Sequence, residues 1–94
     1  MGKPLRRLSV DMSSAGKRGL SIVEPVRKQF AANLRGHREK AGLSQEALAE
    51  ACDLHRTEIS LLERCKRSPR LETLVILSRG LGLPELGDLL KGIR

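Results

Sequence analysis

Four basic residues stand between positions 64 and 70 of this 94-residue chain. Their guanidinium and ammonium groups are the side-chain groups that bind phosphate oxygens, and a net charge of +7 attracts polyanions. The alternative is a solvated basic loop, which is the usual role of a run of charge. The four residues are Arg64, Lys66, Arg67 and Arg70. Charge alone leaves both roles open and does not identify the polyanion that would carry the phosphate.

The composition excludes several classes of protein. Phe30 is the one aromatic residue, so a surface on which bases stack, as in RNA-recognition sheets, is not expected. No run approaches the roughly 20 apolar residues of a membrane helix, and the basic N-terminus lacks the apolar segment of a secretory signal. Two cysteines are too few for a disulfide scaffold. We therefore expect a cytoplasmic protein that does not associate with membranes.

Neither enzymatic activity nor a cofactor is expected. The sequence offers no Ser/His/Asp constellation, phosphate loop or pair of catalytic carboxylates. Its cysteines and histidines, at positions 37, 52, 55 and 65, lack a recognised spacing of metal ligands, so no metal is expected. Cys65 lies between Arg64 and Lys66, whose charges favour the reactive thiolate. It is a candidate redox thiol, with an inert thiol as the alternative.

Apolar residues at helical spacing predict an all-α protein. Val26, Phe30 and Leu34 are four residues apart and mark one face of a first helix. Pro25 suits the first turn of that helix. The helix should end near residue 41, because Gly42 can adopt the left-handed conformation that follows many helices.

Four shorter helices are expected after Gly42. Ser44 is a good N-cap for a helix that ends at residue 51 or 52. Residues 56–63 form the next helix, and residues 71–81 form a fourth that Gly82 ends. Pro84 opens a short fifth helix. Gly80 inside the fourth helix weakens it by about 1 kcal/mol relative to Ala.

Residues 1–24 differ from the rest of the chain. They carry five basic and two acidic residues, a small polar stretch at 13–16 and no apolar periodicity. This composition predicts a flexible basic arm with a charge of +3. The remaining +4 lies on residues 25–94, which we expect to form one folded domain.

The segment 44–63 has the anatomy of a helix-turn-helix, which ordinary helix pairs in bundles share. The residues themselves are more specific. The run LSQEALAE at 43–50, the run ISLLER at 59–64, KRSP at 66–69 and LETL at 71–74 resemble the phage-repressor and Cro-like (XRE) family. The likeness spans residues 27–90. It implies a compact five-helix bundle of the lambda-repressor-like DNA-binding type, with its third helix in the major groove and its second across the DNA backbone.

The resemblance also implies which residues contact DNA. The side of helix 56–63 that faces the groove carries Arg56, Thr57, Ser60 and Leu61. The residues that the resemblance places against DNA phosphates are Gln45, Arg64, Lys66, Arg67 and Arg70. The guanidinium of Arg56 can bind guanine O6 and N7, which is the commonest specific base contact. Gln45 could instead brace the next helix, and Glu58 could accept from cytosine N4 or repel phosphate.

Other matched positions are structural. By the resemblance, Arg38 and Glu63 form an ion pair between the first and third helices. The chain departs from the family where Gly is usual: Asp53 stands in the turn and Cys65 stands after the third helix. Asp tolerates the left-handed conformation better than most residues, whereas Cys there introduces strain or redirects the loop.

These observations predict a sequence-specific, double-stranded-DNA-binding regulator of transcription. A domain this small reads few base pairs, so a homodimer on a palindromic site, with half-sites about 34 Å apart, is expected. Apolar residues near the C-terminus are the candidate dimer interface: Leu86, Leu89, Leu90 and Ile93. Their alternative role is in the core. Two other functions remain open, an antitoxin that also binds a protein partner, and a protein-interaction module that has lost DNA binding.

Overall fold

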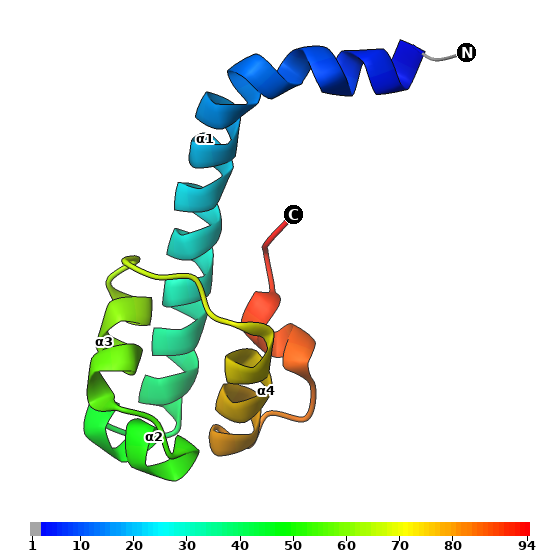
Figure 1. Ribbon diagram of the computed structural model, residues 1–94. Coiled ribbons are helices and arrows are strands. Elements are labelled where there is room, and N and C mark those ends of the chain that lie inside the picture. Colours follow the sequence, from blue (N-terminus) through cyan, green and yellow to red (C-terminus); the bar gives the residue numbers. More distant parts are fainter. Residues whose placement is uncertain (1–2) are drawn as a thin grey trace.

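Four α-helices and one 3-10 helix form the described part of the chain (Figure 1). The structure is a computed structural model that describes the backbone of residues 3–94 and the side chains of residues 22–94. The elements are α1 (Lys3–Lys40), α2 (Gln45–Cys52), α3 (Arg56–Glu63), α4 (Leu71–Gly80) and the 3-10 helix η1 (Leu86–Leu90). No strand occurs among residues 3–94, so the predicted all-α class is confirmed.

Local chemistry sets the ends of the first helices. Gly42 has a φ of +74°, and the amide of the following Leu43 donates to the carbonyl of Arg38 at 3.0 Å. Ser44 Oγ accepts from the amide of Ala47 at 3.0 Å. Asp53 has a φ of +55°, which turns the chain from α2 into α3. The predicted end of the first helix and the predicted cap of the second are confirmed.

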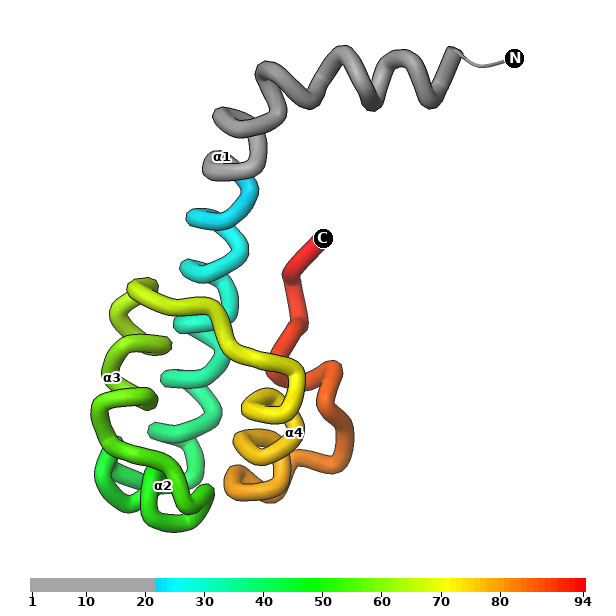
Figure 2. The backbone as a smooth tube through the Cα atoms, viewed as in Figure 1, coloured from blue at the N-terminus to red at the C-terminus, as the bar shows by residue number. Residues whose placement is uncertain are grey.

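The core lies where the five elements meet. Helix α1 packs against α3 and η1, α2 packs against α3 and α4, and α4 packs against η1. The backbone trace shows α2 closing one end of this arrangement (Figure 2). Every element contributes to the buried apolar cluster, which comprises Phe30, Leu34, Leu48, Ala49, Cys52, Ile59, Leu62, Leu74, Leu77 and Leu89. Helix α3 is therefore held from two sides by its neighbours.

The predicted start of the first helix at Pro25 is wrong, because Pro25 lies inside α1. Apolar periodicity marks only the part of a helix that packs against a core, so it does not locate the first residue. The predicted flexible arm over residues 1–24 falls mostly on residues 1–21, whose side chains lie outside the described part of the chain. The arm stays a prediction.

The predicted fifth α-helix is wrong in type. The segment is the 3-10 helix η1, in which the amide of Asp88 donates to the carbonyl of Glu85, three residues back. Five residues, one of them Gly87, are too few to offset the cost of starting an α-helix. The residues described thus contain four α-helices, not five.

Gly80 has a packing role that its helix propensity hides. A Cβ at this position would overlap Sγ of Cys52, which is buried on α2. Burial also raises the pKa of the Cys52 thiol, which keeps it protonated. The glycine therefore allows α4 to lie close against α2.

We expect Gly80→Ala to lower the free energy of unfolding by about 1–2 kcal/mol, although alanine favours helices, because the added methyl overpacks the α2–α4 contact. Urea denaturation of the wild type and the variant measures the change. In the Cys52→Ala background the overlap is gone, and Gly80→Ala should then be neutral or stabilising. An equal loss in both backgrounds would contradict this account of Gly80.

Among the residues that the structure describes, no helix combines the length and the apolarity needed to cross a membrane.

Candidate nucleic-acid interface

Helix α3 presents one face away from the core. Ile59 and Leu62 are fully buried, and the helical period of 3.6 residues places the predicted base contacts on the other side. Arg56 and Thr57 are exposed in the first turn, and Ser60 and Leu61 are half-buried one turn later. The structure thus brings all four predicted base-contacting residues onto one face of one short helix. Such a helix has a size that the major groove admits.

An ion pair fixes α3 to α1. Arg38 Nε donates to Glu63 Oε2 at 2.6 Å, and its Nη2 donates to Oε1 at 3.0 Å. The side chains are 11% and 4% exposed, respectively. The hydrogen bond to Glu63 raises the pKa of Arg38 above its ordinary value. The structure therefore contains the pair that the resemblance implies, in the bidentate geometry that favours Arg over Lys.

Two more groups join this pair into a network. Arg38 Nη1 donates to the carbonyl of Leu43 at 2.8 Å, at the start of the loop before α2. Gln45 Nε2, in the first turn of α2, donates to Glu63 Oε1 at 3.1 Å. The structure thus places the Gln45 side chain in the bracing role that the sequence left open. The network joins α1, α2 and α3, and it sets the angle at which α3 is presented.

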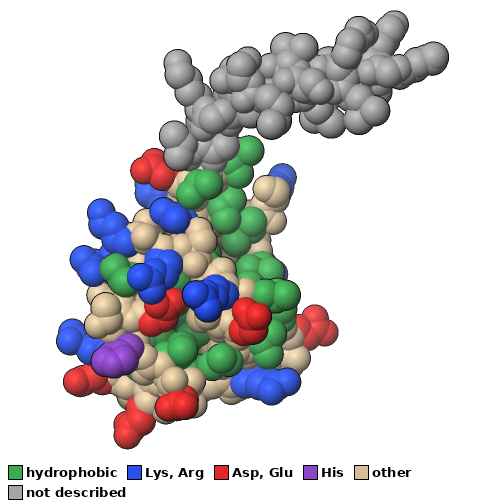
Figure 3. All heavy atoms as spheres, in the orientation of Figure 1, with side chains coloured by type: hydrophobic (Ala, Val, Ile, Leu, Met, Phe, Trp, Pro, Cys, Tyr) green, Lys and Arg blue, Asp and Glu red, His purple; other side chains and the backbone are tan. Residues whose placement is uncertain are grey.

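The basic loop follows directly from α3. Arg64, Lys66, Arg67 and Arg70 are all exposed. Arg64 Nε donates back to Ser60 Oγ at 3.1 Å, and Arg27 Nε on α1 donates to Ser68 Oγ at 2.9 Å. Lys and Arg side chains gather over α3 and this loop, with some acidic side chains among them, and further acidic side chains lie at the end formed by α2 (Figure 3). The loop therefore carries positive charge beside the exposed face of α3, where backbone phosphates would flank a groove.

Sequence reasoning missed the part that Arg27 plays in holding this loop. Its hydrogen bond to Ser68 spans 41 positions in the chain, so no local pattern signals it. His55, the N-cap of α3, makes no side-chain capping hydrogen bond. Its ring is exposed next to Arg56.

Cys65 lies directly after the C-cap of α3 in a strained conformation. Its φ is +62°, and the amide of Lys66 donates to the carbonyl of Leu61 at 2.9 Å across the turn. For a residue with a Cβ, this left-handed conformation costs roughly 1–2 kcal/mol. The Cys65 side chain is half-buried. The strain that the sequence anticipated at this departure from Gly is present, and the redox role of the thiol stays a prediction.

We expect Cys65→Gly to raise the free energy of unfolding by about 0.5–1 kcal/mol, because glycine relieves the left-handed strain but adds freedom to the unfolded chain. Thermal denaturation measures the gain. Cys65→Ala is the matched control, since it removes the thiol and retains the Cβ. Equal stabilities of the Gly and Ala variants would show that backbone strain is not stored at this residue.

The candidate dimer residues divide into two groups. Leu89 is fully buried in the core of the single chain, which removes it from the candidate interface. Leu86, Leu90 and Ile93 are half-buried and pack against the core. Among residues 22–94, the large apolar side chains that are exposed lie elsewhere, at Ile22, Val23, Leu71 and Ile76. Ile93 also lines a groove of about 340 Å³ together with Ile22 and Val26 of α1.

Known proteins share this arrangement. The helix-turn-helix family HTH_3 matches residues 34–87. Control protein C.SmaI from Serratia marcescens is 45% identical over 56 residues, which cover 60% of this chain and 67% of that protein. Control protein C.BamHI from Bacillus amyloliquefaciens is 42% identical over 59 residues, covering 62% and 73%. The solved restriction-modification controller protein C.AhdI from Aeromonas hydrophila has a TM-score of 0.64 and 33% identity, covering 67% of this chain and 94% of that one.

Proposed function

Because this chain belongs to the helix-turn-helix family HTH_3, we propose that it regulates transcription by binding a palindromic DNA site as a homodimer. It is a DNA-binding transcriptional regulator. The exposed face of α3 enters the major groove, with Arg56, Thr57, Ser60 and Leu61 against base edges. The observation that carries this assignment is the placement of those four residues on one face, beside an exposed basic loop.

The flanking residues position the protein on the DNA. Arg64, Lys66, Arg67 and Arg70 bind phosphates of the backbone that borders the groove. Gln45 Nε2 uses one of its two hydrogens to brace Glu63, so the second hydrogen is the one that would donate to a phosphate. Regulators of this kind act where the DNA lies, so the proposed location is the cytoplasm. Residues 1–24, as a basic arm outside the domain, add sequence-independent attraction.

The relatives also favour one biological setting. Two similar proteins are named control proteins, and the solved C.AhdI is a restriction-modification controller. Control of a restriction–modification system is therefore the setting we propose, in preference to the antitoxin role. A homodimer doubles the few base contacts of one domain and matches a two-fold symmetric site.

Selection of bound duplexes from a random pool tests this function. The full chain should enrich two inverted half-sites about 34 Å apart, and its affinity should fall steeply with salt as counterions are released. Sedimentation of the complex should give two chains per duplex. A variant with the arm's basic residues replaced by Gln should keep the same site and lose affinity on all sequences. Affinities that stayed within the non-specific range for every duplex would contradict the proposal.

A further inference from the structure

Glu58 lies on α3, the helix proposed to enter the major groove, but its side chain is not directed toward a base edge. Its carboxylate forms an ion pair with Nη1 of Arg67, nine residues further along in the basic loop. The Glu58 side chain is 20% exposed, whereas that of Arg67 is 52% exposed. The acid is thus largely covered by its surroundings, and the base remains open to solvent on its other side.

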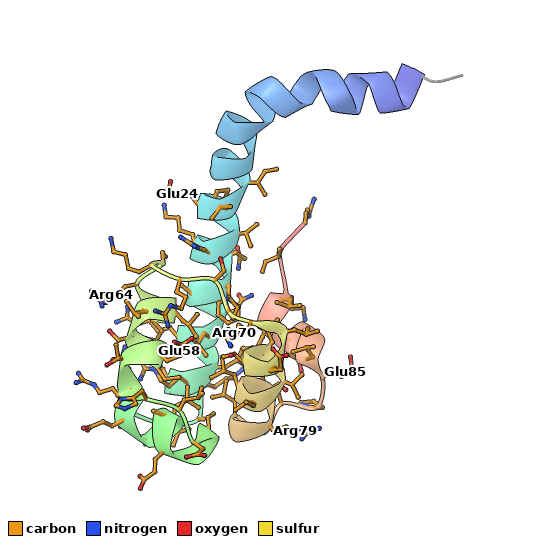
Figure 4. The ribbon with its side chains drawn as sticks, in the orientation of Figure 1. Glu24, Glu58, Arg64, Arg70, Arg79 and Glu85 are labelled. Carbon is orange, nitrogen blue, oxygen red and sulfur yellow. The ribbon has the colours of Figure 1, made fainter. Side chains whose placement is uncertain are left out.

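The position of Glu58 on α3 explains this pairing. The helical period places it beside the buried Leu62 and nearly opposite Arg56 and Ser60, and Leu61 is its neighbour on the side of the groove. Glu58 lines a polar recess of about 500 Å³ between α3 and the start of α4. The other residues that line it are Arg67, Ser68, Arg70 and Thr73. Figure 4 shows Glu58 and Arg70 between α3 and α4, and Arg64 on the other side of α3. A side chain in this recess is directed toward the loop and not toward a base edge.

We propose that Glu58 competes with DNA phosphate for Arg67 and so limits the affinity of this protein for DNA of every sequence. The proposal rests on the DNA-binding function given above. A carboxylate offers the same bidentate oxygens that a phosphate offers to a guanidinium. Arg67 must therefore share or exchange its partner when the loop meets the backbone. Glu58 contacts no base in this arrangement, so its effect is the same on specific and random duplexes.

The expected size of the effect on DNA affinity follows from the exposure of the ion pair between Glu58 and Arg67. Ion pairs with one exposed partner change an equilibrium by up to about fivefold, and they weaken as salt screens them. Each phosphate that a protein neutralises adds about 0.9 to the slope of log affinity against log salt. Release of Arg67 should therefore appear both in the affinity and in the salt dependence.

The test compares Glu58→Gln with the wild type on a selected duplex and on a random duplex over a range of salt concentrations. The glutamine keeps the size and a hydrogen-bonding oxygen but removes the charge. We expect affinity at low salt to rise about threefold to fivefold on both duplexes, and the salt slope to steepen by up to about 0.9. Thermal denaturation of each variant confirms that it is folded at the binding temperature.

Two controls separate the pairing from total charge. Glu85→Gln removes the same unit of negative charge beside η1, away from α3 (Figure 4), and should raise affinity by less than Glu58→Gln. In the Arg67→Gln background the competitor has no partner to release, so Glu58→Gln should bring little further gain. A gain of the same size with and without Arg67 would overturn the proposal.

The remaining outcomes also decide the matter. A changed preference at one base pair in Glu58→Gln would show that Glu58 reads a base, and a loss of affinity on both duplexes would show that it braces the loop. Either result would overturn the proposal that Glu58 competes with DNA phosphate for Arg67. These failures are distinct from failure of the proposed function, in which the affinity of the wild type would stay within the non-specific range for every duplex.

Discussion

Replacing Arg38 by Met is expected to lower the free energy of unfolding by about 3–5 kcal/mol, because it leaves the carboxylate of Glu63 buried without its main partner. Glu63 is 4% exposed and would retain only the amide of Gln45 as a donor. A domain of this size has a total stability of about 5–15 kcal/mol, so the loss is a large share of it. Urea denaturation followed by circular dichroism measures the change.

The double variant Arg38→Met/Glu63→Leu identifies the cause. It removes both charges and should cost less than Arg38→Met alone, because no charge is then stranded. The exposed pair of Arg35 and Glu39 is a matched control on the same helix, with side chains 64% and 59% exposed. Arg35→Met should cost about 0.5 kcal/mol or less. A double variant that is less stable than the single one would contradict a stranded-charge mechanism.

The same network connects stability to recognition. Arg38 holds Glu63 at the end of α3 and the Leu43 carbonyl before α2, while Gln45 connects α2 to Glu63. The hydrogen bonds therefore fix the two helices of the motif relative to α1 as one unit. A loss of this network should reduce affinity for a selected site more than for random DNA, because base contacts depend on the angle of α3 and phosphate attraction does not.

Features that depend on neighbouring residues could be predicted from the sequence. Ser44 caps α2 and Gly42 ends the chain's first helix, because each follows from the chemistry of a few adjacent positions. The pair of Arg38 and Glu63 is 25 positions apart, and it was implied by the resemblance to a family rather than by any local pattern.

Features that depend on the path of the chain in space could not be predicted in this way. The pairing of Glu58 with Arg67 requires the loop at 64–70 to fold back over α3. The need for Gly80 appears only when Cys52 of α2 is packed against α4. In the sequence, Leu86, Leu89 and Leu90 are equivalent candidates for a dimer interface. Only the packing of η1 decides that Leu89 is the fully buried one of the three. In each case the deciding partner lies on another element.

Arg56→Ala should weaken binding to the selected duplex by about 1–3 kcal/mol, which corresponds to roughly 5-fold to 150-fold, and relax the preference at one base position. Arg56 is exposed in the first turn of α3, and its guanidinium can bind O6 and N7 of one guanine. Because the side chain is exposed, the folded state should lose little stability. Affinity for selected and random duplexes, with a repeated selection, measures both effects.

Lys66→Ala is the matched control, because it removes one positive charge from the adjacent loop without removing a base contact. Its affinity should fall by a similar factor on selected and random duplexes, and its salt slope should fall by about 0.9. The two variants thus separate recognition of bases from attraction to the phosphate backbone. A bidentate hydrogen bond distinguishes one base from another, and a single charge near a phosphate does not. If Arg56→Ala also lost affinity equally on both duplexes, Arg56 would be a phosphate contact and α3 would read bases through Thr57, Ser60 and Leu61 alone.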